Sequence, residues 1–360
     1  MNKTNLLETL KIQTKSYGQG MMIAYIKKRV KNIKGAKLRS DKHGNIYVTK
    51  GVEENYPCVV SHMDTVHDIY KDFAIFEHDD KWFAFDGELN RQVGIGGDDK
   101  VGVFITLEAL EHFDNIKVAF FVDEEVGTVG SKKADMSFFN NVGFVLQCDR
   151  KGYGDFVNDC WKTELYAQDF SGAVAGILEQ YGYKESDGGL TDVVALKENG
   201  LAVACANMSC GYYKPHTDEE YIVLEDVKDC HNMVLDIIES LQGQRFEHEH
   251  TKTVDDDWFS RGYDWRYSTK CATNGKLTGT KNWTIKTKTI GETPYEIVGI
   301  CKEPQCYGNI LLVAQGCYYC EDCWVDVSVE NVEFYDEHEP EENYIDYNED
   351  DLNDDIAMAV

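Results

Sequence analysis

The sequence predicts an α/β fold in three layers, in which a mixed, mainly parallel sheet carries helices on both faces. Two patterns support this fold class. Short apolar segments, such as 117–122 and 142–148, predict buried strands, and they alternate with segments whose apolar residues have helical spacing, such as 224–242. Because a strand that is covered on both faces is apolar along its length, this alternation is typical of a parallel sheet between two layers of helices.

The other elements follow from the same two patterns. Helical spacing predicts further helices over 4–33, with a break near 16–20, and over 100–113 and 171–181. A glycine-rich turn at 94–97 precedes the second of these. Short apolar runs predict strands at 46–48, 56–61 and 201–207, and a hairpin at 72–86 whose turn lies at 79–81.

Composition divides the chain into three regions. At about 150 residues per domain, 360 residues allow about two domains. We expect a first domain at 1–243. Thr, Lys, Gly and aromatic residues dominate 276–300, so 244–335 is predicted to be a small β-rich domain that contains cysteines. Residues 336–360 are highly charged and have few core-forming residues, which predicts a disordered acidic tail.

The negative charge argues against two classes of partner. The chain has 64 acidic and 36 basic residues and a net charge of −28. Nucleic acid and anionic membranes are therefore not expected partners, because each phosphate contact would be made against a repulsive field. Residues 321–360 hold 16 of the acidic residues and no Lys or Arg, so much of this charge belongs to this last stretch of the sequence.

The sequence predicts neither export nor membrane insertion. The first residues lack a continuous hydrophobic stretch, and the longest apolar runs are far shorter than the roughly 20 residues that span a bilayer. The 12 cysteines do not have the spacing of a small secreted scaffold. We therefore expect a cytoplasmic protein.

Side chains with metal-ligand chemistry follow strand ends or tight turns in the segments 61–66, 96–100, 123–127, 147–149 and 215–217. Ligand sites of α/β sheets lie beyond the carboxyl ends of the strands, so these segments are expected to meet. Two histidines and three carboxylates suit a pair of divalent ions; zinc is favoured, and manganese or cobalt could replace it. Asp99 and Lys100 could instead begin a solvated helix. The other histidines, among them His67, His231 and His248, are expected at the surface.

The ordered motifs resemble the signatures of the co-catalytic dinuclear zinc exopeptidases. In chain order they are SHMDTV, GGDDKVG, DEEVG, a strand-end aspartate and HTDEEY. This superfamily includes peptidase T, carboxypeptidases of the glutamate-carboxypeptidase type, and the glutamyl and leucyl aminopeptidases. The resemblance covers about residues 38–240 and implies that 1–243 is a catalytic domain that binds two metal ions.

The resemblance implies a role for each metal ligand. His62 and Asp149 would hold one zinc ion. Glu125 and His216 would hold the other. Asp98 would bridge the two ions, as a carboxylate with two oxygens can do.

The resemblance also assigns the proton chemistry. Glu124 would be the general base and acid that acts on a water activated by the two metals. Asp64 would accept the second N–H of the His62 imidazole and fix its tautomer. In the family, the peptide that matches Asp98–Asp99 is often cis.

Two short intervals separate this chain from some of its relatives. The intervals 64–98 and 149–216 leave no room for the inserted domain of the tetrahedral aminopeptidases or for the lid domain of peptidase T. A catalytic domain without a lid is therefore expected. It resembles the aminopeptidase branches, in which the Asp that matches Asp192 lies near the site. Tyr212 or Tyr213 would then replace the donor to the oxyanion that a lid supplies elsewhere.

Cysteines near the C-terminus predict a second metal site. Two pairs at knuckle-like spacing could hold a structural zinc ion, and they are Cys301 with Cys306 and Cys320 with Cys323. Cys317 offers a competing ligand. Some of these cysteines could instead belong to a hydrophobic core.

Together these inferences predict a metal-dependent exopeptidase, an aminopeptidase that hydrolyses small peptides. A carboxypeptidase or an N-acyl amino-acid deacylase could use the same centre. A non-catalytic binding protein that retains the fold is the alternative from another class. A peptide substrate is the expected partner, and the sequence leaves the oligomeric state open.

Overall fold

A computed structural model describes residues 1–160 and 163–249 and, beyond them, short strands between 286 and 334. The chain divides into two compact units, Met1–Thr251 and Lys252–Val360. The predicted tail at 336–360 lies outside the described residues. The first unit continues a few residues past the expected boundary near 243, because a bridge between Val203 and Glu247 joins the segment after the last helix to it.

A nine-stranded mixed sheet forms the centre of the described part of the first unit, in the order β1-β2-β7-β3-β8-β12-β9-β10, with β11 paired to β9. The middle strands β7, β3, β8 and β12 run parallel, and antiparallel strands flank them. The strands are β1 (Ala36–Ser40), β2 (Ile46–Lys50), β3 (Tyr56–His62), β7 (Ile116–Phe121), β8 (Val142–Arg150), β9 (Asp155–Cys160), β10 (Thr163–Glu164), β11 (Lys184–Gly188) and β12 (Cys205–Ser209). The predicted fold class is confirmed for this unit.

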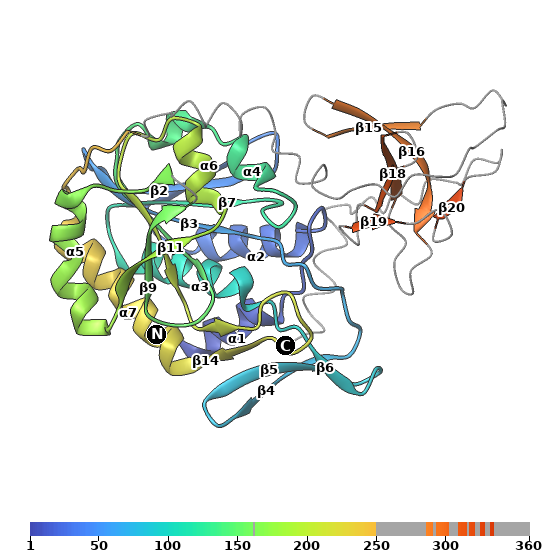
Figure 1. The fold of residues 1–360 in the computed structure, drawn as a ribbon. Helices are drawn as coiled ribbons and strands as arrows, with labels where there is room; N and C mark the ends of the chain where they lie inside the picture. Colours follow the sequence, from blue (N-terminus) through green and yellow to red (C-terminus); the bar gives the residue numbers. More distant parts are fainter. Residues whose placement is uncertain are drawn as a thin grey trace. The chain divides into compact units, whose positions relative to one another are not determined.

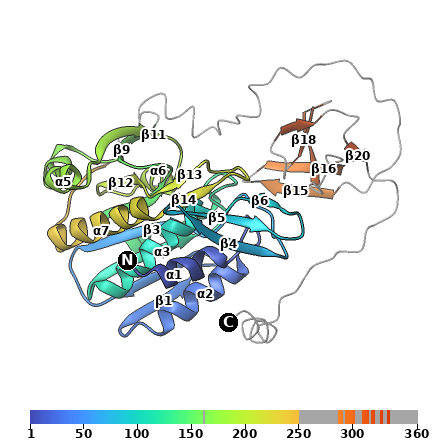
Figure 2. The ribbon, with the colours of Figure 1, turned by 90° about the horizontal axis from the view of Figure 1, so that it is seen from below.

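Helices cover both faces of this sheet, as Figure 1 shows. The helices α3 and α6 contact the same strands, β3 and β8, from opposite sides. Figure 2 shows α7, α3, α1 and α2 side by side in the layer on the α3 face. The helices are α1 (Lys3–Lys11), α2 (Gly20–Lys31), α3 (Gly97–His112), α4 (Val129–Lys132), α5 (Gln168–Tyr181), α6 (Asp192–Glu198) and α7 (Leu224–Leu241), with a 3₁₀ turn at Met136–Phe139.

The core explains why these residues form these elements. All seven residues of β3 and all six of β7 are buried, so both strands are apolar along almost their whole length. The helix α3 is buried on nearly every side, because it packs between the sheet and the neighbouring helices. Buried polar residues also lie at the carboxyl ends of β3 and β8, among them His62 and Gln147, and predicted ligands lie at or beyond these ends.

A second, smaller sheet joins two distant stretches of the first unit. Its order is β13-β14-β5-β4, with β6 paired to β5. The strands are β4 (Phe73–His78), β5 (Lys81–Asp86), β6 (Arg91–Val93), β13 (Tyr212–Tyr213) and β14 (Tyr221–Val223). The strands β4 and β5 are the predicted hairpin. Because β14 pairs with β5, the loop at 214–220 lies beside the turn at 94–97.

The described strands of the second unit form a sheet in which every pair is antiparallel. They are β15 (Lys286–Ile290), β16 (Thr293–Cys301), β17 (Asn309–Ala314), β18 (Cys317–Cys320), β19 (Val325–Val327) and β20 (Val332–Phe334). Cys301 and Cys320 lie at strand ends, whereas Cys306 and Cys323 lie outside the described residues. The zinc ribbon therefore stays a prediction. In the part of the chain that the structure describes, no helix has the length and apolar character that a membrane span requires.

Candidate metal centre

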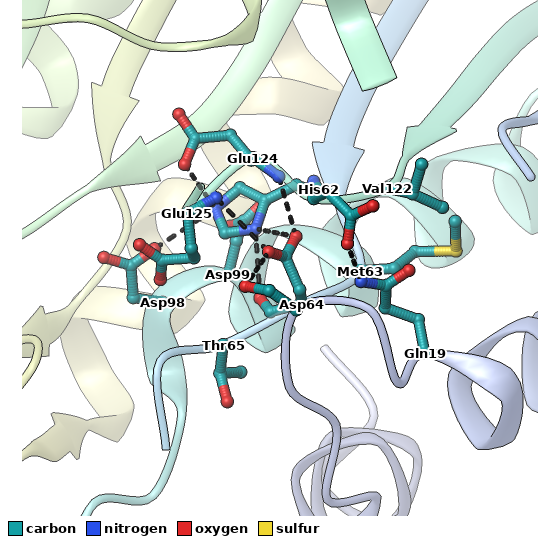
Figure 3. A network of polar contacts seen from close by, with 12 residues as sticks. Gln19, His62, Met63, Asp64, Thr65, Asp98, Asp99, Val122, Glu124 and Glu125 are labelled. Carbon is teal, nitrogen blue, oxygen red and sulfur yellow. Dashed lines mark hydrogen bonds and ion pairs between the residues drawn. The ribbon is translucent and has the colours of Figure 1, made fainter. Parts of the chain in front are cut away.

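The predicted ligands converge at the carboxyl ends of three adjacent parallel strands. His62 is the last residue of β3, which lies between β7 and β8. Asp149 lies near the end of β8, and Glu125 follows β7 by four residues. Asp98 is the second residue of α3, and His216 lies in the loop between β13 and β14. Figure 3 shows the side chains of His62, Asp98, Glu124 and Glu125 gathered around one point.

Asp98 occupies the middle of this cluster and presents one carboxylate oxygen to each histidine. Its Oδ1 lies 3.3 Å from Nε2 of His62, and its Oδ2 lies 3.4 Å from Nε2 of His216. A second carboxylate accompanies each imidazole. Asp149 Oδ1 lies 3.5 Å from His62 Nε2, and Glu125 Oε2 lies 3.1 Å from His216 Nε2.

These separations fit ligands that surround a common cation. Tetrahedral zinc with bonds of about 2.0–2.1 Å places neighbouring ligand atoms roughly 3.3 Å apart, which is longer than most hydrogen bonds. Among the described residues, His62 Nε2 and Glu125 Oε1 are buried and have no hydrogen-bond partner. Such orphaned buried atoms are rare, and a bound cation satisfies them. The ligand atoms of His62, Asp98 and Glu125 all lie within 4.8 Å of one another.

Asp99 also belongs to such a group, with His62 and Asp149. However, its two oxygens accept the backbone N–H groups of His62 at 3.0 Å and Gly102 at 3.1 Å. The peptide between Asp98 and Asp99 is cis. Asp99 and Lys100 are buried, and the Lys100 ammonium donates to the Leu10 carbonyl at 2.7 Å, so the alternative of a solvated helix start is wrong.

The electrostatics of the cluster show an excess of negative charge. Burial and the Asp98 carboxylate raise the pKa of Glu125 to about 8. Burial also raises the pKa of Glu124 well above its ordinary value, and the nearby Asp149 carboxylate acts in the same direction. Hydrogen bonding to Asp98 and Glu125 raises the pKa of His216 to about 10. Each shift reduces net negative charge, which a divalent cation does more effectively.

Asp64 ties the ends of β3 and β7 together. Its carboxylate accepts the N–H groups of Glu124 at 3.0 Å and Glu125 at 3.2 Å, and the hydroxyl of Ser16 at 2.7 Å. Its Oδ1 lies 3.4 Å from Nδ1 of His62, whereas its own backbone carbonyl is closer, at 3.0 Å. Asp64 therefore orients His62 mainly through its backbone and fixes the Glu124–Glu125 turn through its carboxylate.

Asp149 is oriented by neighbouring polar side chains. Its Oδ2 accepts the Thr191 hydroxyl at 2.8 Å and the Gln147 amide at 3.1 Å. The same Gln147 amide donates to Asp192 at 3.2 Å, so Gln147 links Asp192 to Asp149 of the cluster. Burial raises the pKa of Asp192 to about 7.

The two candidate tyrosines have different positions. The Tyr212 hydroxyl lies 3.3 Å from Asp149 Oδ1, within the cluster. Tyr213 points away from it, because its hydroxyl donates to Asp226 on α7 at 2.6 Å. Of the two, Tyr212 is the one that the structure places at the site.

Several residues were misjudged from the sequence. His67, His231 and His248 were expected at the surface, but their side chains are only 11%, 5% and 9% exposed. The largest omission is Glu220, which is fully buried beside the Asp98 loop. Its position within a run of three acidic residues gave no sign of burial; only the pairing of β14 with β5 covers it.

No protein-family model matches the sequence, and no curated protein matches it. Solved structures do. Aminopeptidase PepT from Bacillus cereus has a TM-score of 0.55 at 15% identity, with 66% of this chain and 97% of that chain covered. A tripeptidase from Staphylococcus aureus has a TM-score of 0.52 at 14% identity, with 66% and 96% covered. The chain has the fold of these peptidases.

A third structure gives the same result. An aminopeptidase from the archaeon Desulfurococcus kamchatkensis has a TM-score of 0.51 at 16% identity, with 67% of this chain and 96% of that chain covered. The resemblance that the motifs indicated is thus confirmed for the fold. About a third of this chain lies outside each of these matches.

Proposed function

We propose that the chain is a metal-dependent aminopeptidase that hydrolyses small peptides. The observation that carries this proposal is the position of Asp98 between two histidines, each with a further carboxylate beside it. The peptidase fold of the first unit supports it, because the cluster lies where such α/β sheets place their ligand sites.

Five side chains would hold two cations. His62 and Asp149 form one half of the site, and His216 and Glu125 form the other. Asp98 belongs to both halves. Imidazole and carboxylate ligands favour zinc, and they also accept manganese or cobalt. Divalent cations bound there would lower the pKa of water and polarise a peptide carbonyl.

Glu124 would move the proton. Its Oε2 lies 3.9 Å from His62 Nε2, so its carboxylate borders the cluster, and the Asp64 carboxylate fixes its backbone. It would take the proton of the attacking water as that water adds to the peptide carbonyl. It would then give the proton to the leaving amine as the C–N bond breaks. Burial raises the pKa of Glu124 well above its ordinary value, which is the direction expected of a carboxylate that accepts a proton and later releases it.

The charge around the site favours a substrate with a free α-amine. Beyond the assigned ligands, Glu124 and Asp192 add carboxyl groups at the site, and in their charged form these attract an ammonium group. Two cationic side chains lie near the loop that carries His216, but Lys214 is paired with Glu219 and Arg91 with Asp218. A substrate carboxylate would have to displace these pairs, so a carboxypeptidase is the less favoured alternative.

A substrate panel tests the proposal. The full-length chain, supplied with Zn²⁺, Mn²⁺ or Co²⁺, is offered tripeptides with a free N-terminus, the same peptides with an acetylated N-terminus, and N-acyl amino acids. We expect hydrolysis of the free peptides alone, with release of the N-terminal residue. Preferential cleavage of N-acyl amino acids would favour the deacylase, and cleavage of none would leave the non-catalytic alternative. Metal analysis of the same samples counts the ions per chain.

A further inference from the structure

A buried carboxylate lies behind the loop that carries Asp98. Glu220 is fully buried, and its Oε1 accepts the backbone N–H of Asp98 at 3.1 Å. Its Oε2 accepts the backbone N–H of Gly96 at 2.7 Å. Gly96 has a left-handed backbone conformation, with φ of +69°, so the loop turns sharply between the two bonds. One carboxylate therefore holds both sides of this turn.

His67 holds Glu220 from the other side. Its Nε2 lies 2.6 Å from Glu220 Oε2, and it must be the donor because a carboxylate only accepts hydrogen bonds. The His67 ring fills the space beside Gly94, since a Cβ at that glycine would overlap the ring. His67 is thus wedged between the backbone before the turn and the carboxylate that holds the turn.

Glu220 also connects the two loops that meet at the candidate cations. It follows His216 by four residues, and its backbone N–H donates to the Thr217 carbonyl at 3.1 Å. Its side chain reaches the Asp98 loop, as described above. The relative position of His216 Nε2 and Asp98 Oδ2, 3.4 Å apart, therefore depends on Glu220 through both backbone segments.

We propose that Glu220, held by His67, is the positioning residue that fixes Asp98 between the two cation sites; this inference rests on the proposed function. Burying a carboxylate without partners is costly, and here three donors on two separate loops compensate it. Both oxygens are used by N–H groups, so Glu220 acts through the backbone of Asp98 and does not touch a cation or the substrate. A carboxylate ligand on an irregular loop needs neighbouring residues that hold the loop, because the loop alone does not keep the ligand within about 0.5 Å of the position that binding requires.

Metal binding by the full-length chain tests this inference without relying on activity. The affinities for Zn²⁺ are measured by competition with a chromophoric chelator, and the Co²⁺ absorption spectrum reports the ligand geometry. We expect Glu220→Ala to weaken the binding of at least one ion by about 10- to 100-fold and to change the Co²⁺ spectrum. Glu220→Gln keeps one accepting oxygen and is expected to have a smaller effect.

Two further variants examine the contribution of His67. His67→Gln keeps an N–H donor near Glu220 and is expected to retain most of the affinity, whereas His67→Leu removes the donor and is expected to weaken binding. In active preparations, the loss should fall mainly on kcat rather than KM, because Asp98 and not a substrate contact is displaced.

Asp86 provides a matched control. It is buried in β5 of the same small sheet, and its carboxylate also accepts two backbone N–H groups, those of Leu89 at 2.7 Å and Asp72 at 3.3 Å. Asp86→Asn therefore removes a comparable buried carboxylate that has no bond to a ligand loop. We expect it to leave the cation affinities and the Co²⁺ spectrum unchanged.

The outcomes separate this inference from the proposed function. Unchanged affinity and spectrum in Glu220→Ala, or a loss in Asp86→Asn equal to the loss in Glu220→Gln, would overturn the positioning role while peptidase activity stands. A different outcome would overturn the proposed function and support the inference. In that outcome the wild-type chain binds two cations but hydrolyses no peptide, and Glu220→Ala binds the cations more weakly. If Glu220→Ala does not fold, the cation affinities of Glu220→Gln and His67→Leu decide whether Glu220 positions Asp98.

Discussion

Buried charged side chains find their partners in different ways at the two ends of the central sheet. Buried lysines lie at the amino ends of β7 and β12. Lys50, which pairs with the first residue of β7, donates to the carbonyls of Leu110 and Glu111 at 3.1 Å, where α3 ends. Lys197 donates to the Val203 carbonyl at 2.5 Å, just before β12. At the carboxyl ends, by contrast, carboxylates face one another and the histidines.

The two ends of the sheet differ in the source of the groups that compensate the buried charges. The chain itself satisfies each lysine with backbone carbonyls, some of them at a helix C-terminus, where partial negative charge favours a cation. At the other end, Glu125 Oε1 and His62 Nε2 have no partner among the described residues. Under the proposed function, the lysines at the amino ends contribute to stability, and the cluster at the carboxyl ends would be completed by cations. Four predictions test this contrast.

The largest effect is expected at the carboxyl ends. Glu124→Gln should lower kcat by about 10²- to 10⁴-fold, because an amide cannot carry the proton between water and the leaving amine. Steady-state kinetics give the rate, and metal analysis should still find the wild-type number of ions, since Glu124 is not an assigned ligand. Retained turnover would exclude Glu124 as the base, and lost ions would make it a ligand.

Removal of metal is expected to lower stability at the same end. A ligand at a hundredfold excess over its Kd stabilises a folded protein by about 2.7 kcal/mol, so chelation should reduce the apparent Tm of the first unit. Asp98→Asn removes the central carboxylate, and its Tm should depend much less on the chelator. Differential scanning calorimetry with and without EDTA measures both. If wild type and variant responded equally, Asp98 would not contribute to the site.

A smaller loss is expected at the amino ends. Lys197→Met leaves the carbonyls of Val203 and His248 without their donor, which costs about 1–3 kcal/mol of unfolding free energy. Urea unfolding measures this loss. The turnover of folded molecules should stay at the wild-type value, because Lys197 lies at the far end of the strands. A lower kcat in folded Lys197→Met would contradict the claim that the amino ends contribute to stability alone.

The smallest effect is a dependence on pH. Burial lowers the pKa of Lys197 below its ordinary value of 10.5. Between that lowered pKa and 10.5 the unfolded chain holds a proton that the folded chain lacks, so the unfolding free energy rises with pH in this window. Urea unfolding of wild type and Lys197→Met across this pH window isolates the contribution of Lys197 to the pH dependence of the unfolding free energy. Parallel curves would show that Lys197 stays protonated in the folded chain.

The sequence predicted the elements with a strong periodic signal. The strands β3, β7 and β8 are mostly apolar runs, and residues of the cluster lie at or just beyond their carboxyl ends, such as His62 at the end of β3. The strand β11 was missed, because its residues KESDG lack apolar alternation and pair through the backbone at the sheet edge. Such a strand is fixed by its neighbour and not by its own sequence.

The residues of the cluster were also easier to predict than the residues that hold them in place. His62 and Asp98 belong to local motifs. Glu219 and Glu220 are adjacent and chemically the same, yet Glu219 is exposed and pairs with Lys214, whereas Glu220 is fully buried. Only tertiary pairing of β14 decides which of them points inward, and no local pattern in the sequence contains that information.

The unequal exposure of the two histidines has a consequence for how the site exchanges its contents. The His62 side chain is 1% exposed, at the end of a strand within the central sheet. The His216 side chain is 52% exposed, on a loop of the small sheet. For the two cations that we propose, exchange with the solvent is therefore expected mainly at the His216 half of the site. Chelation should empty the His216 half first, and it should be the last to refill.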